Sequence, residues 1–571
     1  MGLFSFFTKR DNSLPNNQDS DDELLLPNNQ ENDDDDEQQQ HEQQQIEDFS
    51  QKDYTTNSEL FGWYLYSWAA EPFVVSAMST YVPILLEQFA RENGVRLDDH
   101  SMPCIQPSDP GITPSPLLPP PTTNTTMAID ATRSLAKLFA RDIQAEQETV
   151  KCVLYVLGSY IDTSSYALYT FSFSVLVQTL TVISMSGAAD RGHYRKHLLI
   201  TFGVIGALAT ISFKLITSAK YYLASILAIV AISSFGAVNV CGNAFLPILI
   251  SNSKEIKNEN DSLRKSNLIT KISGVGAASG YISALIVQIL SMLIVLKTGS
   301  STSSIQYAIF FVGVWWLVFQ IPLTYLLKSR PGPPLSINKN EHYFVQYIKY
   351  GWKALFASIK HASNLRDVLI YLFGWFIISD SVTTMNSAAI LFAKTELQMT
   401  TPKLVIIGIL SVISAILGSI IIPQLQSYYK VSPKTSLIAI IVWASIIPFY
   451  GILGFFFKQI GLKHVFEMYI LAIWYGVSMG GLATVSRSLF SLLIPKGKES
   501  TFFSLFSVTD KGSSVIGPTV TALITDKTHN IRYCFFFLWF LLIIAIPVYS
   551  LLDVERGNKE ARELEHVEDL E

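Results

Sequence analysis

Repeated apolar runs dominate this chain and limit which folds it can adopt. A helix needs about 20 apolar residues to cross ~30 Å of hydrocarbon at 1.5 Å per residue. A strand edge exposed to lipid would leave backbone groups without hydrogen-bond partners, so the runs must be helical. We predict an all-α polytopic membrane protein. Its twelve expected spans are residues 60–89, 153–185, 198–217, 222–250, 270–296, 306–327, 368–393, 403–424, 435–457, 465–494, 502–524 and 533–552.

The distribution of charge supports this prediction. Only 16% of the residues are charged, whereas a soluble domain usually carries about 25%. The formal net charge of −5 comes largely from the two tails. Composition therefore does not favour nucleic acid as a partner, and we expect the partner of the long runs to be the lipid bilayer. No nucleotide-binding loop or metal-ligand cluster is present, so we expect no cofactor and no direct use of ATP.

The basic residues of the short loops predict the orientation. If the N-terminus is cytosolic, the inner loops hold about nineteen Lys and Arg, against about nine in the outer loops. Both termini should therefore be cytosolic. Residues 554–571 then form a charged cytosolic tail.

Residues 1–57 form an acidic tail rich in Asn and Gln, which cannot bury a core and should be disordered in the cytosol. Within it, Asp21 precedes the pair Leu25 and Leu26 by four positions. This spacing resembles acidic dileucine sorting signals, which clathrin-adaptor complexes bind. The alternative is a solvated acidic tail with accidental leucines.

The first outer loop, 90–152, is the only long segment expected between spans on that side. Its middle is rich in proline, and Asn124 begins a glycosylation sequon. Cys104 and Cys152 share this side and can form a disulfide, although sequence alone does not decide it. Cys241 and Cys534 fall in or beside spans and are interpreted as packing residues.

An internal repeat divides the chain into two halves. Leu60–Trp63 in the first span and Leu372–Trp375 in the seventh both read LFGW, and each is followed by an aromatic residue and a serine. The repeat predicts six-helix halves at 58–327 and 367–553, joined by a cytosolic linker at 328–366. Two parallel halves with a site between them are typical of the major facilitator superfamily.

The loop between the second and third spans resembles the cytosolic loop motif of that superfamily. It reads Gly187, Asp190, Arg191 and Arg195 within GAADRGHYRK. The resemblance implies charge-assisted contacts that latch the halves in one conformation. The sequence departs from the motif because Gly192 directly follows Arg191. The alternative is an ordinary basic inner loop.

Four further segments occur in order along the chain. They are GWYLYSWAAEPF, NVCGNAFLPIL, SGVGAASGYISA and SVTDKGSSVIGP. Together they resemble the autophagy-related protein 22 family, fungal vacuolar amino-acid exporters of the major facilitator superfamily. The resemblance covers nearly all of the chain after the acidic tail. It implies a multi-pass protein of the vacuolar membrane that exports neutral amino acids, such as leucine and tyrosine, released by autophagic proteolysis.

Ionisable residues inside spans are the first candidates for a transport site, because each costs about 2.5–3.5 kcal/mol at a helix centre. Glu71 lies mid-span before Pro72, Asp380 lies in the seventh span, and Asp510 and Lys511 lie together in the eleventh. Glu71 or Asp380 can accept hydrogen bonds from a substrate ammonium, and Lys511 or asparagine amides can bind its carboxylate. The alternative is a charge network that only holds the helices together.

Polar residues elsewhere complete the candidate site. Asn239 and Asn243 share one helix face and can bind substrate or only bridge helices. Tyr66 and Trp63 can border a pocket, although aromatic residues near span ends are more often interfacial anchors. Arg487 can act as a gate or can snorkel to the membrane surface. Two glycine pairs, Gly276/Gly280 and Gly476/Gly480, are interpreted as close-packing faces.

These residues favour a secondary transporter that works by alternating access. Proton coupling is plausible because a desolvated Glu71 would tend to keep its proton. A membrane enzyme would need an acid/base or nucleophile constellation at one membrane face, and none is evident in the sequence. A non-transporting amino-acid sensor or scaffold on the same fold stays open as the alternative, because fold does not determine function.

Overall fold

The computed structural model describes residues 54–97, 99–104, 152–156, 158–191, 193–254, 262–299, 301–332, 343–360, 365–397, 399, 401–513, 516–528 and 530–568. Four of the predicted functional residues lie outside these ranges. They are the sorting residues Asp21, Leu25 and Leu26 and the sequon residue Asn124.

The first half of the chain begins with one long span built from three consecutive helical segments. Thr56 caps it by accepting a hydrogen bond from the Glu59 backbone, and Pro72 is followed by a π-helical stretch. The helices of this half are α2 (Asn57–Pro72), η2 (Phe73–Tyr81), α3 (Val82–Glu92), α5 (Thr163–Asp190), α6 (Tyr194–Ser212), α7 (Tyr221–Ser251), α8 (Ser262–Lys297) and α9 (Thr302–Leu326). Short 3-10 turns, η3 (Phe213–Leu215) and η4 (Ser218–Lys220), join α6 to α7.

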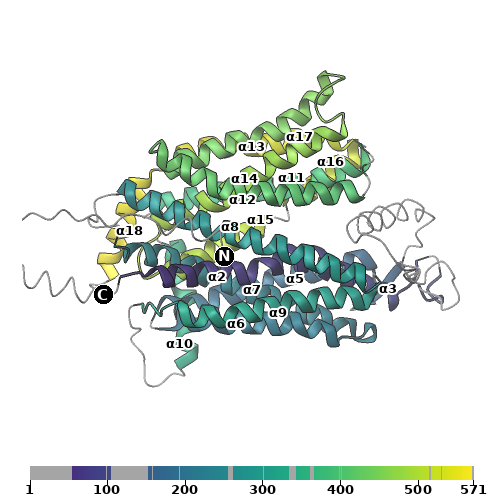
Figure 1. Ribbon diagram of the computed structural model, residues 1–571, viewed down its shortest axis with the longest axis horizontal. Helices are drawn as coiled ribbons and strands as arrows, with labels where there is room; N and C mark the ends of the chain where they lie inside the picture. Colours follow the sequence, from purple (N-terminus) through teal and green to yellow (C-terminus); the bar gives the residue numbers. More distant parts are fainter. Residues whose placement is uncertain are drawn as a thin grey trace, which may run out of the picture. The chain divides into compact units, whose positions relative to one another are not determined.

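The second half repeats this arrangement after a connecting helix, α10 (Tyr343–Lys360). Its helices are α11 (Arg366–Thr395), α12 (Thr401–Tyr428), α13 (Pro433–Phe456), α14 (Val465–Leu493), α15 (Glu499–Ser513), α16 (Ile516–Thr528), η6 (Ile531–Tyr533), α17 (Cys534–Ser550) and α18 (Val554–Glu568). Figure 1 shows the start of α2, α10 and α18 toward one end of the bundle. We call this the proximal end, and we call the opposite end the distal end.

Within the described ranges, eleven helices are long and apolar enough to cross a membrane. The predicted eleventh span, 502–524, is occupied by α15 and α16, on either side of residues 514–515, which lie outside the described ranges. The α15 helix begins beside Asp190 at the proximal end, and α16 leads to η6, where Arg532 lies 4.0 Å from Glu396 at the far end of α11. The pair therefore also passes from one end of the bundle to the other. The all-α, polytopic fold is confirmed.

The predicted second span, 153–185, began too early. Residues Cys152–Val156 and Ser159–Asp162 form strands β2 and β3 of a small antiparallel sheet, and β2 also pairs with β1 (Val95–Arg96). Gly158, with a φ of 89°, makes the turn between them. A disulfide joins Cys104 to Cys152 beside this sheet. An apolar run of this kind satisfies either a strand or a helix, so hydropathy alone did not separate them.

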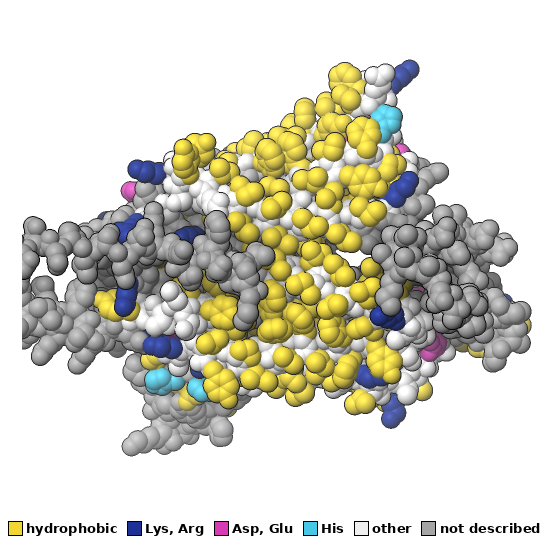
Figure 2. Space-filling model, viewed as in Figure 1, with side chains coloured by type: hydrophobic (Ala, Val, Ile, Leu, Met, Phe, Trp, Pro, Cys, Tyr) yellow, Lys and Arg dark blue, Asp and Glu magenta, His cyan; other side chains and the backbone are white. Residues whose placement is uncertain are grey.

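The outer surface of the helices is apolar in a broad band. Figure 2 shows hydrophobic side chains over the middle of the visible face, with Lys and Arg mostly toward its two ends. Large apolar side chains such as Phe373, Ile470 and Phe540 are more than half exposed. Such a surface suits lipid, because an exposed patch of this extent is not found on ordinary soluble monomers.

The internal repeat has the same role in both halves. A Cβ on Gly62 would lie 2.8 Å from the Leu327 backbone nitrogen, at the end of α9. A Cβ on the equivalent Gly374 would lie 2.6 Å from the Tyr549 ring of α17. Each repeated glycine thus lets the first helix of its half approach the sixth closely.

An ion pair with a buried carboxylate closes each half at the proximal end. Glu59 at the start of α2 accepts two hydrogen bonds from Arg330, at 2.9 and 2.8 Å, just after α9. Asp367 at the start of α11 accepts two from Arg556 of α18, at 2.7 and 2.8 Å. Both carboxylates are fully buried. Each pair therefore fixes the first helix of its half to the segment that follows the last one.

Candidate functional site

A small cavity lies between the two halves, close to the middle of the bundle. Its lining comes from α2, α7 and α14, so both halves contribute to it. The cavity measures about 30 Å³, which holds about two water molecules. The lining residues are Tyr66, Ser67, Ala70, Glu71, Phe235, Val238, Asn239 and Arg487.

Glu71 is the acidic residue of this lining, as the sequence predicted for a candidate site. Its side chain is partly buried and packs against Gly280 of α8, where a Cβ would lie 3.2 Å from it. Among the described residues, none lies within hydrogen-bond or ion-pair distance of its carboxylate. Its main cationic neighbours are Arg487 and Lys511.

Arg487 is the basic residue of the lining, and it reaches across from α14 to the first half. Its Nη1 donates to the Tyr66 hydroxyl at 3.3 Å and to Asn243 Oδ1 at 3.4 Å, and its Nη2 donates to the Ser273 carbonyl at 3.4 Å. Within its own helix, Nε donates to the Ala483 carbonyl at 2.9 Å. The side chain therefore does not snorkel to the surface; it spans the boundary between the halves.

A hydrogen-bonded chain of polar side chains lies behind the cavity wall. The Tyr66 hydroxyl donates to Asn243 Oδ1 at 2.9 Å, and Asn243 Nδ2 donates to Asn239 Oδ1 at 2.6 Å. Asn239 lines the cavity, whereas Asn243 bridges α7 to α2. Trp63 is fully buried and donates to the Gly242 carbonyl at 2.7 Å, so it is not an interfacial anchor.

The other predicted ionisable residues lie on a different seam, between α11 and the α15–α16 pair. Asp380 accepts a hydrogen bond at 2.8 Å from the Gly517 backbone at the start of α16. Asp510 accepts from Ser379 at 2.8 Å and Trp375 at 3.2 Å, and lies 3.4 Å from Lys511. None of these three charges is in the cavity lining, although Lys511 is also a cationic neighbour of Glu71. The contacts of Asp380 and Asp510 instead suit holding α15 and α16 against α11.

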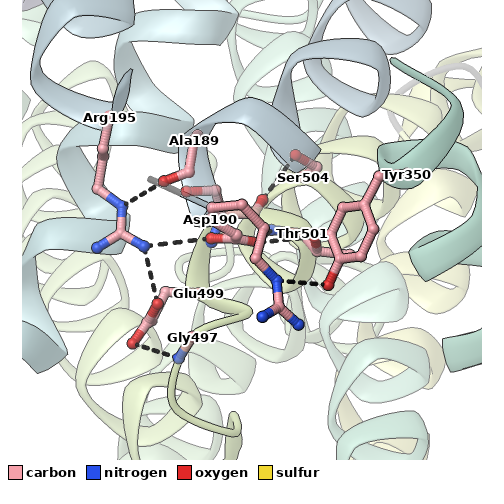
Figure 3. Close-up of polar contacts among 10 residues, drawn as sticks. Ala189, Asp190, Arg195, Tyr350, Gly497, Glu499, Thr501 and Ser504 are labelled. Carbon is pink, nitrogen blue, oxygen red and sulfur yellow. Dashed lines mark hydrogen bonds and ion pairs between the residues drawn. The ribbon is translucent and has the colours of Figure 1, made fainter. Parts of the chain in front are cut away.

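The predicted loop motif forms a second polar cluster at the proximal end, shown in Figure 3. Asp190 accepts hydrogen bonds from the Ser500 backbone at 2.6 Å, the Thr501 backbone at 2.8 Å and the Thr501 hydroxyl at 2.7 Å. Arg195 donates to Asp190 at 3.2 Å and to Glu499 at 2.9 Å. Asp190 thus occupies the N-terminus of α15, where a helix dipole favours negative charge. The cluster joins α5 of the first half to α15 of the second.

The connecting helix α10 packs beside this cluster. A Cβ on Gly187 would lie 2.6 Å from the Gly351 backbone nitrogen, so these two glycines allow α5 and α10 to touch. Arg191 donates to the Tyr350 hydroxyl at 2.8 Å and stacks over its ring. Of the four motif residues, Asp190 and Arg195 contact α15 of the opposite half directly. Gly187 and Arg191 instead contact α10.

Hydrogen bonds between the halves gather near the proximal end. Besides the Asp190 cluster, Thr270 and Ser488 are 2.6 Å apart, and Ser273 donates to the Thr484 carbonyl at 3.0 Å. These residues lie early in α8 and late in α14, which are the proximal parts of both helices. The structure is therefore a conformation in which the proximal end is closed.

The glycine pairs pack as the sequence predicted. A Cβ on Gly276 would lie 2.7 Å from the Trp63 ring, and Gly280 packs against Glu71. Gly476 and Gly480 pack in the same way against the backbone of α12. These positions carry no polar chemistry of their own.

Two participants in these sites are not evident from the sequence. The sequence indicates Arg487 only as a gate or a snorkelling residue, not as part of a binding cavity. Glu499 is not among the predicted residues, although an acidic residue in the first turn of a helix is a recognisable signal. Nothing in the sequence shows that it lies 2.9 Å from Arg195, because the two residues come from different halves.

Comparison with known proteins places the chain in a family. Residues 55–562 match the family described as "Vacuole effluxer Atg22 like". The chain belongs to this family. It is 51% identical to autophagy-related protein 22 of Pichia angusta over 549 residues, covering 90% of this chain and 95% of that protein. It is 46% identical to autophagy-related protein 22 of Saccharomyces cerevisiae over 530 residues, covering 89% and 93%.

Solved structures of similar fold are transporters of the major facilitator superfamily. The proton:xylose symporter XylE aligns with a TM-score of 0.57 at 11% identity, covering 89% of this chain and 99% of that one. FucP in the outward conformation aligns with a TM-score of 0.53 at 14% identity, covering 88% and 99%. This member of the vacuole effluxer family therefore has the major facilitator fold. Family and fold together make it a multi-pass transporter of the vacuolar membrane.

Proposed function

We propose that this protein exports neutral amino acids from the vacuole lumen to the cytosol by alternating access. One observation carries the proposal. Glu71 and Arg487 have opposite charges and line the same cavity, and neither has an ion-pair partner at contact distance within the described ranges. A charge inside a membrane protein usually faces a partner or a water-filled path. A substrate with both charges would satisfy the two residues together.

An amino-acid zwitterion has the chemistry that this lining requires. Its ammonium would interact with the Glu71 carboxylate, and its carboxylate with the Arg487 guanidinium. The apolar lining of Ala70, Phe235 and Val238 suits a neutral side chain. A cavity of about 30 Å³ is too small for leucine, so binding requires the halves to separate around the site.

Two observations support cytosolic termini. The short loops are richer in Lys and Arg on the proximal side, as the positive-inside rule expects for the cytosol. The disulfide between Cys104 and Cys152 lies beside the sheet that follows α3, away from the proximal end. Disulfides persist in oxidising compartments rather than in cytosol. We therefore assign the proximal end to the cytosol and the distal end to the lumen.

Efflux from proteoliposomes tests this proposal. Purified protein is reconstituted into liposomes that are loaded with radiolabelled leucine. The efflux rates of the wild-type protein and of Glu71→Gln are then compared. Gln keeps the volume of the side chain but removes its charge and its titration. We expect the variant to insert normally and to lose most efflux. Glu555→Gln, on the exposed side of α18, is the matched control and should export at the wild-type rate.

Exchange of labelled for unlabelled leucine separates the roles of Glu71. If Glu71 carries a coupled proton, the variant should retain exchange; if it binds the ammonium, exchange should also be lost. Wild-type efflux from Glu71→Gln, with only lower thermal stability, would instead show that the carboxylate merely ties helices together. Leucine binding without any flux in the wild-type protein would support the sensor alternative and refute the export proposal.

A further inference from the structure

The hydrogen bonds of Arg487 across the cavity are unusually weak for a guanidinium. The three that reach the first half are 3.3–3.4 Å long, and all their acceptors are neutral. Charge-assisted bonds to a carboxylate are typically 2.7–2.9 Å and about twice as strong as neutral ones. Arg487 is thus held by its own helix through Ala483, while its outer nitrogens have only weak partners.

These weak bonds are also contacts between the halves. Tyr66, Asn243 and Ser273 belong to α2, α7 and α8 of the first half, and Arg487 belongs to α14 of the second. The bonds lie next to the Ser273–Thr484 contact at 3.0 Å, which belongs to the closed proximal end. A ligand that takes the guanidinium away from these acceptors therefore also removes bonds that hold this end closed.

We propose that the substrate carboxylate binds Arg487 and, by displacing its bonds to the first half, releases the proximal end. The inference rests on the proposed function and adds a substrate requirement to it. Substrates need a free α-carboxylate to be moved, because only an anion makes two parallel bonds to the guanidinium. An amine without this carboxylate still binds Glu71 but leaves Arg487 on Tyr66, Asn243 and Ser273. Such an amine occupies the site but does not open the proximal end.

The accessibility of position 273 to a labelling reagent tests whether the substrate carboxylate opens the proximal end. Ser273 is fully buried, and the hydrogen bond from Arg487 uses its backbone carbonyl, so Ser273→Cys leaves that bond in place. The substitution weakens the side-chain bond to Thr484, so all rates are compared within the Ser273→Cys protein. The rate at which a membrane-impermeant maleimide labels this cysteine from the proximal side reports opening. The probes are leucine and 3-methylbutylamine, which is leucine without its carboxylate. Binding of each is measured by displacement of radiolabelled leucine.

Leucine should raise the labelling rate several-fold, whereas 3-methylbutylamine should displace leucine without raising it. In Arg487→Gln, the basal labelling rate should rise several-fold, because three bonds between the halves are lost. Leucine should then no longer change the rate. Arg487→Lys keeps the positive charge but loses the planar guanidinium that makes two parallel bonds. Leucine should therefore raise its labelling rate less than it does with arginine present.

Two results would overturn the inference: equal acceleration of labelling by the amine and by leucine, or an undiminished leucine response in Arg487→Gln. If Arg487→Gln does not fold, the comparison of ligands on the Ser273→Cys protein still decides. Leucine flux in wild-type proteoliposomes separates this from the broader proposal. If leucine is transported but leucine and 3-methylbutylamine accelerate labelling equally, only the role of Arg487 is refuted. If leucine is not transported, the export function is refuted and the inference with it.

Discussion

Replacing Asp190 by asparagine should shift the balance between the closed and open conformations of the proximal end. One carboxylate oxygen of Asp190 accepts from both the backbone and the hydroxyl of Thr501, at 2.8 and 2.7 Å. The NH2 group of asparagine cannot accept a hydrogen bond, so in either orientation at least one backbone N–H of α15 loses its acceptor, and the remaining bonds lose their charge. Bonds to charged groups contribute about 1.5–3 kcal/mol each, so the closed form loses up to about 3 kcal/mol. That is up to roughly a hundredfold change in the equilibrium.

Maleimide labelling of Ser273→Cys measures this equilibrium, and its rate should rise by up to about a hundredfold in Asp190→Asn. Transport should slow more than leucine binding weakens, because the cavity residues are unchanged and only the exchange between conformations is biased. Asp99→Asn, an exposed carboxylate near the distal sheet, is the matched control. Unchanged labelling, or equal losses of binding and transport, would refute the assignment of Asp190 as a latch.

Three further outcomes are expected. Leu25→Ala with Leu26→Ala should divert a fluorescently tagged protein from the vacuolar membrane without affecting its fold; an unchanged distribution would contradict the sorting signal. Gly276→Ala should lower the thermal midpoint, since overpacking typically costs 1–3 kcal/mol. Gly408→Ala, which meets no neighbour within 4 Å, should not lower it, and equal shifts would argue against close packing. Cys152→Ser should abolish a mobility change on reduction and lower stability by up to about 4 kcal/mol, as loop closure predicts; identical melting curves would show that the disulfide is dispensable.

Much of the fold could be predicted because hydropathy and repetition are properties of the linear sequence. The LFGW segments at Leu60 and Leu372 identified the two halves, and Gly62 and Gly374 have equivalent contacts in the structure. The strands at 152–162 were missed because their apolar pattern continues directly into the apolar start of α5. Their assignment depends on pairing with Val95 and Arg96, more than 50 residues earlier in the chain.

The candidate site was only partly predictable, because composition does not reveal how each helix is rotated about its axis. Glu71 and Asn239 face the cavity, as does Arg487 from the opposite half. Asp380 and Asp510 satisfied the same criterion of charge within a span, yet their oxygens bind groups on the seam between α11 and the α15–α16 pair. Distinguishing these cases requires knowing which helix faces meet, and those are set by contacts between distant segments.

The two ion pairs that close the halves also imply an order of assembly during synthesis. The Glu59–Arg330 pair is complete as soon as the segment after α9 has been made, so the first half can reach its final form while the second is still on the ribosome. Asp367 begins the second half, but Arg556 follows all of its membrane helices. Until then the Asp367 carboxylate lacks both the Arg556 guanidinium and the α18 backbone at Gly557 that packs over it. A chain that stops short of α18 therefore leaves this carboxylate uncovered, and the first helix of its second half is not fixed to the end of the last one.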